Sequence, residues 1–257
     1  MHTPAIRTVL ITGAAHRIGR TLARDFAARG WRVAVHYRRS RDAAADVVSE
    51  IEAAGGIAVA LAADLADADA VAGLIPRCRQ ALGAPTCLIN NASEFLFDDL
   101  ASLSPGRWDA HFAINLKAPV FLAKVLAEQL PEGAEGNVVN LIDQRVLRPG
   151  PEFFSYTLAK AGLWSATGML AQALAPRVRV NAIAPGPVLQ SVHQTSEEFE
   201  SERRQTLLGR GTSPAEIATA IAFILDAPAM TGQMIALDGG QHLARRADPS
   251  RKQRGPD

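Results

Sequence analysis

The sequence predicts a doubly wound α/β fold, with a seven-stranded parallel sheet and helices on both faces. Three observations support this class. Short apolar runs alternate with helical patterns along the chain, which is typical of βαβ units. Most of the short runs are continuously apolar, as expected for strands that are buried on both faces. The first run is followed at once by a glycine and a helical pattern, an arrangement that presents backbone N–H groups to a phosphate.

The N-terminal half begins with a buried strand at residues 7–12 and a helix at 14–30. The helix has an apolar face that includes Ile18 and Leu22, and it stops at Gly30. The elements that follow are, in order, a strand at 31–37, a helix at 42–54, a strand at 57–63, a helix at 67–82 and a strand at 87–90.

The C-terminal half contains a long helical pattern at 103–130, which we expect to be interrupted near 117–119 by a proline. A strand at 137–142, a helix at 155–175, a strand at 177–183, a helix at 214–225 and a strand at 234–237 complete the alternation. Residues 190–211 are polar and acidic, and they interrupt it. We expect a lid there; an exposed helix pair is the alternative.

Composition narrows the protein class. The 257 residues are 48% hydrophobic, enough for the core of one domain, which we place at residues 1–243. The polar, basic segment 244–257 is expected to be a disordered tail. A net charge of +1 shows no excess of positive charge for binding nucleic acid. No apolar run approaches the roughly 20 residues of a membrane span.

The two cysteines and the N-terminus indicate a cytoplasmic protein. Cys78 and Cys87 lie in apolar surroundings without metal-ligand spacing, so we expect reduced packing residues and no metal site. Residues 1–8 lack the apolar core of a signal peptide.

Tyr156 and Lys160 form the first candidate catalytic pair. On a helix, residues four apart share one face. A free tyrosine has a pKa of about 10, and a fixed cation nearby favours the phenolate and lowers that pKa toward the working range. Taken alone, this spacing is more often that of an ordinary amphipathic helix, so the interpretation depends on the rest of the chain.

Arg38, Arg39 and Ser40 follow the second expected strand, where the adenosine ribose of a bound dinucleotide would lie. An acidic residue there would bind a free 2′-hydroxyl, whereas arginines accommodate a 2′-phosphate. A solvated turn is the alternative. After a glycine turn, the pattern favours NADPH as the cofactor.

These features together resemble the short-chain dehydrogenase/reductase family over about residues 8–240. The motifs that carry the resemblance are Thr-Gly-Ala-Ala-His-Arg-Ile-Gly at 12–19, Asp64-Leu65, Asn-Asn-Ala-Ser at 90–93, Asn115, Tyr-Thr-Leu-Ala-Lys at 156–160 and Pro185-Gly186. The resemblance implies a single Rossmann domain. It also implies that the long helices at 103–130 and 155–175 pack against symmetry mates, and we expect a homotetramer.

Two departures from the family pattern resemble its pteridine reductase branch. The middle glycine of the first turn is Arg17, and the usual serine thirteen residues before Tyr156 is Asp143. The motifs at 36–40 and 90–95 strengthen this likeness, which implies NADPH as cofactor and a reduced pterin as product. That branch includes bacterial dihydromonapterin and dihydrofolate reductases. After Gly186 the family often has a threonine, but residues 188–190 supply none, so the contact to the nicotinamide amide stays unassigned.

The resemblance and the chemistry together assign the site residues. The expected catalytic residues are Asp143, Tyr156, Lys160 and Asn115, the last holding a water that relays protons. The expected cofactor-binding residues are Gly13, Arg17, Ile18, Gly19, His36, Arg38, Arg39, Ser40, Asp64, Leu65, Asn91, Ala92, Ser93, Tyr156, Lys160, Pro185 and Gly186. The expected substrate contacts are Phe95, which would stack on the pterin, Arg17 and Ser93.

Asp143 decides between substrate classes. A neutral hydroxyl donor suits the negative charge that develops on a carbonyl oxygen, whereas a carboxylate would repel that charge. A pterin is reduced at a C=N bond whose nitrogen needs a proton, and an acid beside Tyr156 can help to deliver it. Asp143 as a structural partner of Arg145 or Arg148, and Phe95 as a core residue, are the alternatives.

Two other functions stay open at this point. One is a carbonyl reductase or alcohol dehydrogenase of the same fold that tolerates Asp143. The other is a non-catalytic NADP(H)-binding protein, which the presence of Asn115, Tyr156 and Lys160 disfavours.

Overall fold

The computed structural model describes residues 7–191 and 194–244, and its centre is one parallel sheet. The strands are β1 (Thr8–Ile11), β2 (Arg32–Tyr37), β3 (Ile57–Ala62), β4 (Cys87–Asn90), β5 (Gly136–Leu141), β6 (Val178–Pro185) and β7 (Met234–Leu237). Their order is β3-β2-β1-β4-β5-β6-β7, so the chain winds outward from β1 in both directions. The predicted fold class is confirmed.

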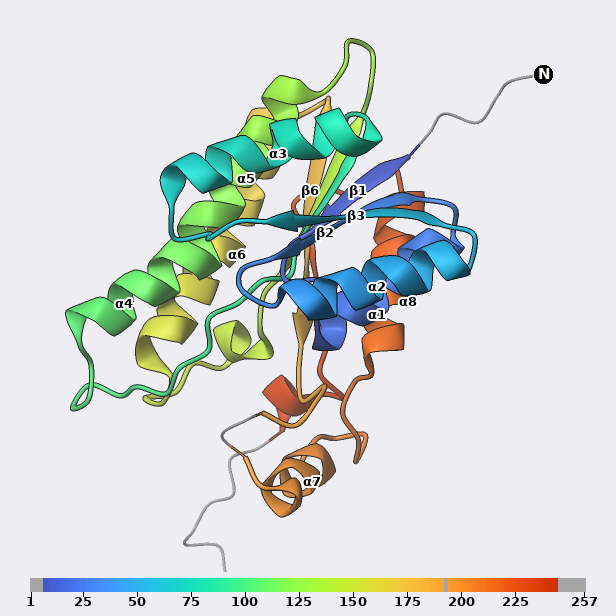
Figure 1. The fold of residues 1–257 in the computed structure, drawn as a ribbon. Helices are drawn as coiled ribbons and strands as arrows, with labels where there is room; N and C mark the ends of the chain where they lie inside the picture. Colours follow the sequence, from blue (N-terminus) through green and yellow to red (C-terminus); the bar gives the residue numbers. More distant parts are fainter. Residues whose placement is uncertain (1–6, 192–193, 245–257) are drawn as a thin grey trace, which may run out of the picture.

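Helices cover both faces of the sheet (Figure 1). One layer contains α1 (Arg17–Ala28), α2 (Arg41–Ala53) and α8 (Pro214–Asp226). The other contains α3 (Ala68–Leu82), α4 (Pro105–Phe112), α5 (Ala118–Gln129) and α6 (Phe154–Leu174). Each layer encloses its own apolar core, one around Phe26 and Ile217 and one around Leu74 and Leu122. The all-apolar strands are explained by this burial on two sides.

The expected interruption near 117–119 is a π-helical turn, η1 (Ala113–Lys117), which joins α4 to α5 without a break. Pro119 lies at the start of α5, directly after this turn. By length and composition, Pro105–Gln129 could therefore cross a membrane, contrary to the expectation from the sequence. Leu122 and Leu126 of this stretch are buried in the core, and core helices of globular proteins meet the same two criteria.

Exposed apolar side chains lie on the outer surface of this layer. Phe121 of α5 is 48% exposed, and Leu158 and Met169 of α6 are 41% and 69% exposed. Such a surface suits a contact with another subunit. The homotetramer remains a prediction.

The acidic segment after β6 contains one helix, α7 (Ser196–Arg204), rather than a helix pair. A capping box between Thr195 and Glu198 begins it. It lies apart from the sheet, at the end where β6 finishes (Figure 1). Two short 3₁₀ turns were not expected, η2 (Gln144–Leu147) and η3 (Gln241–Leu243). Residues 192–193 of the expected lid and 245–257 of the expected tail lie outside the described residues, so both expectations remain predictions.

Candidate active site

A cavity of about 1210 Å³ lies at the carboxyl ends of the central strands. In a doubly wound sheet, ligands bind at this edge, where the strand order reverses. All the predicted site residues except Asp64 and Asn115 line it. The structure thus brings together side chains from the turns after β1, β2, β4, β5 and β6.

The turn after β1 forms an anion cradle at the start of α1. The N-cap residue His16 makes no capping hydrogen bond, and no acidic side chain lies in the first turn. The first N–H groups of the helix therefore remain available to a ligand. A Cβ atom at Gly19 would lie 2.3 Å from the carbonyl oxygen of Gly13, so only glycine allows this close turn. These features fit the diphosphate of a dinucleotide.

His36 fixes the conformation of this turn through hydrogen bonds of its ring. Its Nδ1 accepts a hydrogen bond from the Gly13 N–H at 3.0 Å, so Nε2 carries the proton and donates to the carbonyl of Ala63 at 3.1 Å. Burial lowers the pKa of His36 to about 4, and the ring is neutral near pH 7. The sequence predicted a cofactor contact at His36. The structure places the ring at the cavity wall and uses both of its nitrogens to hold the turn.

We expect His36 to make the fold acid-sensitive. Its pKa is lower in the folded chain than the ordinary value of 6.5, so the unfolded chain takes up the proton first as the pH falls. The stabilisation is complete above pH 6.5 and is lost between pH 6.5 and about 4. The shift corresponds to about 3 kcal/mol. Urea unfolding at pH 7 and pH 4.5 should show a smaller pH dependence for His36→Gln than for the parent. The surface variant His16→Gln should match the parent, and equal pH dependence in all three proteins would contradict the expectation.

Arg17 occupies a backbone conformation that disfavours any side chain. Its φ is 53°, in the left-handed region that glycine adopts without strain, and glycine is the residue that the family pattern has at this position. Its guanidinium donates to the carbonyl oxygens of Leu189 and Gln190 at 3.0 and 2.9 Å. Arg17 therefore ties the first turn to the loop after β6. Nothing in the local sequence indicated this contact.

Arg17→Gly should separate the strain from the charge. We expect the free energy of unfolding to stay within about 1 kcal/mol of the parent value, because relief of the left-handed strain offsets the lost contacts. The KM for NADPH should rise about tenfold through the loss of one charge-assisted contact. Arg17→Ala keeps the strain and loses the charge, so it should be less stable than Arg17→Gly and equally impaired in KM. A normal KM in both variants would remove Arg17 from the binding site.

The expected 2′-phosphate site lies at the start of α2. Ser40 is the N-cap residue of α2, but its hydroxyl makes no capping hydrogen bond. Arg39 is exposed beside it, whereas Arg38 forms an ion pair with Glu94 at 3.3 Å. That pairing was not foreseen. Both partners are partly exposed, and such pairs contribute little stability, so a phosphate can compete for Arg38.

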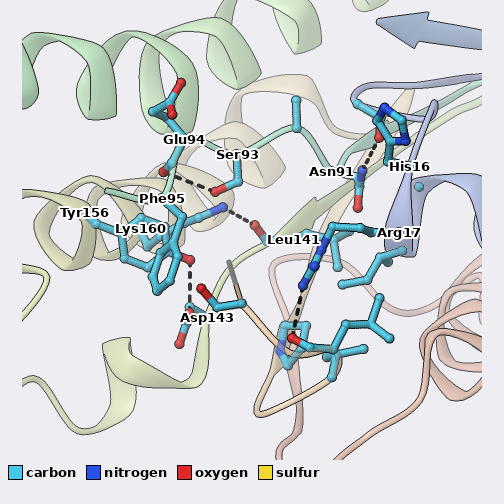
Figure 2. A pocket seen from close by; sticks show the side chains of 18 of the residues that line it. His16, Arg17, Asn91, Ser93, Glu94, Phe95, Leu141, Asp143, Tyr156 and Lys160 are labelled. Carbon is cyan, nitrogen blue, oxygen red and sulfur yellow. Dashed lines mark hydrogen bonds between the residues drawn. The ribbon is translucent and has the colours of Figure 1, made fainter. Parts of the chain in front are cut away.

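Asp143, Tyr156 and Lys160 meet at the inner end of the cavity (Figure 2). The Tyr156 hydroxyl donates to Oδ2 of Asp143 at 3.0 Å, and Oδ1 of Asp143 accepts from the N–H of Arg145 at 2.8 Å. Lys160 Nζ donates to the carbonyl oxygen of Leu141 at 2.7 Å. The helix α6 positions the phenol and the ammonium, and the end of β5 positions the carboxylate.

The electrostatics of this trio differ from the expectation. Burial raises the pKa of Tyr156 well above 10, and the Asp143 carboxylate raises it further. Burial also raises the pKa of Asp143 and lowers that of Lys160 to about 8. The prediction that Lys160 lowers the tyrosine pKa was wrong for this state, because burial and the carboxylate both favour the neutral phenol. Tyr156 is therefore a proton donor hydrogen-bonded to a carboxyl group.

Asn115 and Asp64 do not line the cavity. The Oδ1 atom of Asn115 accepts from the Ser93 hydroxyl and from the Glu94 N–H, both at 3.0 Å, and its Nδ2 donates to the Glu94 carbonyl at 2.8 Å. Asn115 thus holds the loop after β4, and its expected role at a relay water remains a prediction. Asp64 is exposed and accepts from the Ala66 N–H at 3.0 Å, so it stabilises a turn, and its expected contact with the cofactor remains a prediction.

An aromatic wall faces the trio. Phe95 stacks on Phe153 with ring centroids 4.4 Å apart, and it contacts the edge of Tyr156 at 4.8 Å. Phe97 packs against the other side of the cluster, 5.3 Å from Phe153. Phe153 and Phe97 were missed in the sequence, because neither belongs to a motif. The wall suits a flat ring system.

A buried network anchors this wall to α6. The N-cap position of α6 is Phe153, whose φ of 52° and apolar side chain supply no cap. Asp98 supplies one from the loop after β4: its Oδ1 accepts from the Ser155 N–H at 3.2 Å, and its Oδ2 accepts from the Ser155 hydroxyl. His111 Nε2 accepts from the Leu96 N–H at 3.1 Å, so its Nδ1 carries a proton and donates to the Ser155 Oγ at 2.6 Å. Asp98, His111 and Ser155 are fully buried.

Comparisons with known proteins agree on the family. Residues 13–242 match the family model described as enoyl-(acyl carrier protein) reductase. The chain is 33% identical to an uncharacterized oxidoreductase of Methylorubrum extorquens over 91% of this chain and 97% of that one. It is 32% identical to a 3-oxoacyl-[acyl-carrier-protein] reductase of Staphylococcus aureus over 92% of this chain and 98% of that one.

Among solved structures, the fold is similar to that of FolM alternative dihydrofolate reductase 1 from Brucella suis in complex with NADP. The TM-score is 0.92 and the identity 46%, over 94% of this chain and 97% of that chain. The relatives therefore include proteins named for a ketone substrate and one named for a pteridine substrate.

Proposed function

The chain belongs to the short-chain dehydrogenase/reductase family, and from that membership we propose that it uses NADPH to reduce a C=N bond in a pteridine ring. The substrate would be a dihydropterin or dihydrofolate, and the product its tetrahydro form. The coarser assignment, an oxidoreductase of this family, follows from the comparisons. The pteridine substrate is the part of the proposal that goes beyond the comparisons.

The hydrogen bond between Tyr156 and Asp143 carries the proposal. In a carbonyl reductase, the group beside the tyrosine stabilises a developing oxyanion, for which a neutral donor is suited. A carboxyl group in that place is unsuited to an oxyanion. It is suited to a nitrogen that must gain a proton, because an acid whose pKa is raised by burial can resupply its neighbour.

The chain's residues then act as follows. The Tyr156 hydroxyl gives its proton to the ring nitrogen, and the raised pKa of Tyr156 keeps that proton in place until transfer. Asp143, in its acid form, returns a proton to the phenolate through the same hydrogen bond. The Lys160 ammonium, buried on the same helix face, stabilises the phenolate in the interval. Bound NADPH supplies the hydride.

The cofactor would be held by three groups of residues. The uncapped start of α1 suits the diphosphate. Arg38, Arg39 and Ser40 suit the 2′-phosphate. The similarity to a structure solved with NADP supports the same choice. Phe95 and Phe153 would form one wall of the slot for the pteridine.

A ketone substrate is the second candidate, favoured by the similarity to a 3-oxoacyl reductase. The test is NADPH oxidation with dihydromonapterin, dihydrobiopterin and dihydrofolate, compared by kcat/KM with acetoacetyl thioesters and small ketones. We expect the pteridines to be reduced at least tenfold more efficiently. Turnover of ketones alone would overturn the proposal, and NADPH binding without any turnover would indicate a non-catalytic protein.

A further inference from the structure

A second cavity, called the side cavity below, adjoins the inner end of the first. Its volume is about 370 Å³, and Gln144, Arg145, Glu152 and Gln241 line both cavities. Arg148 lines only the second. The side cavity therefore continues the active site beyond the hydrogen-bonded pair of Asp143 and Tyr156.

Arg145 presents a cation to both spaces. Its backbone N–H is bonded to Asp143, and its guanidinium lies 4.7 Å above the ring of Phe153. Within residues 7–191 and 194–244, its guanidinium has no ion pair or hydrogen bond. An arginine has five N–H donors in a planar fork that matches a carboxylate. A half-buried guanidinium with open donors is thus a site for an anion.

Arg148 adds a second cation to the lining of the side cavity. One of its NH groups donates to the carbonyl oxygens of Gln241 and Ala244, which leaves its other donors for a ligand. Two carboxylates near these arginines differ in their hydrogen bonding. Glu202 accepts from the side-chain amides of Gln194 and Gln241, whereas Glu152 is exposed and opposes an anion.

The chemistry of the proposed substrate connects the two cavities. In a 7,8-dihydropteridine, the carbon of the reducible C=N bond is the one that bears the side chain. When that bond faces Tyr156 and Asp143, the side chain must leave the ring beside them. Arg145 is two residues from Asp143, at the entrance of the side cavity. A tail that starts at the reacting carbon is therefore directed toward the two arginines.

On the basis of the proposed function, we infer that the side cavity binds the anionic tail of the substrate, the aryl-glutamate of a dihydrofolate. Arg145 makes the principal contact with a carboxylate, and Arg148 the second. A dihydropterin with a neutral hydroxylated tail gains nothing from these cations. The residues thus favour the dihydrofolate over a dihydropterin with a short neutral tail.

The test is the ratio of kcat/KM for dihydrofolate to kcat/KM for dihydrobiopterin, which share the reacting ring and differ in tail charge. Any effect on Asp143 alters both substrates and cancels in the ratio. Arg145→Gln should lower the ratio about tenfold, as expected for one charge-assisted contact, and Arg148→Gln should lower it severalfold. Glu152→Gln should raise it, because it removes the opposing carboxylate. Arg204→Gln, which removes the same charge from the exposed end of α7, should leave the ratio unchanged.

Binding provides a second readout. The Kd of folate in the presence of NADP⁺, measured by quenching of protein fluorescence, should weaken in Arg145→Gln by the same factor and should weaken with added salt in the parent. Ratios within twofold of the parent in both arginine variants, with both substrates still reduced, would overturn the tail site and leave the pteridine function standing. Failure of the parent to reduce either substrate would overturn both.

Discussion

Asp143→Ser should lower kcat/KM for a dihydropterin by about 10²–10⁴-fold, the range typical of a lost acid-base group. Serine restores the residue that ordinary members of the family have at this position. The Tyr156 hydroxyl keeps a hydrogen-bond partner, so the fold should be retained. The lost function is the proton that Asp143 returns through its bond to Tyr156. Steady-state NADPH oxidation measures the effect directly.

Four controls make this result interpretable. The Kd for NADPH should barely change, because Asp143 is not assigned to the cofactor. Ketone reduction should hold or rise, since the opposing carboxylate is gone, whereas Tyr156→Phe should depress both reactions. Burial raises the pKa of Asp143, so parent pteridine reduction should decline as the pH rises through that raised value, and the serine variant should lack this decline. Undiminished pteridine turnover in Asp143→Ser would make the carboxylate structural.

The parent should prefer NADPH to NADH, and the double variant Arg38→Ala, Arg39→Ala should lose that preference. Each charge-assisted contact to a phosphate contributes about 1.5–3 kcal/mol, or roughly ten- to a hundredfold in kcat/KM. We therefore expect the double variant to lose at least a hundredfold with NADPH and little with NADH. Both cofactors are to be compared at one ionic strength, because screening weakens such contacts.

Glu94 offers a matched control for this experiment. Its carboxylate pairs with Arg38 at the cavity wall. Glu94→Gln should free Arg38 and leave NADPH use unchanged or slightly improved. Equal kcat/KM for the two cofactors in the parent would contradict the assignment of the 2′-phosphate site.

The sequence predicts well those helices and strands that are determined by neighbouring residues in the chain. Continuous apolar runs and glycine stops predict every strand and the long helices, because burial and helix ends are encoded within a few residues. The π-helical turn at η1 depends on packing against distant segments. Its sequence shows only an interruption of the helical pattern. The helix α7 differs, because its capping box of Thr195 and Glu198 is a local signal within the polar stretch.

The residues of the candidate site also fall into two groups, those that a local sequence pattern predicts and those that it does not. The spacing of Tyr156 and Lys160 and the arginines after β2 are local patterns, and both groups lie in the cavity. The contact of Arg17 with Leu189 spans 172 positions, and no periodicity encodes it. The direction of the Tyr156 pKa shift could not be predicted either, because it depends on burial and on a carboxylate from another element.

The cap that Asp98 provides for α6 limits how this active site can be remodelled. The first turn of the helix that carries Tyr156 is completed by a side chain 57 positions earlier, and that side chain belongs to the loop that presents Phe95. A grafted loop without an acidic side chain at position 98 would remove the cap, and a first turn of α6 without Ser155 would leave Asp98 and His111 without this buried partner. The aromatic wall and the start of the helix are therefore one module. Libraries that aim to change substrate choice should recombine residues 94–98, His111 and Ser155 as a single block.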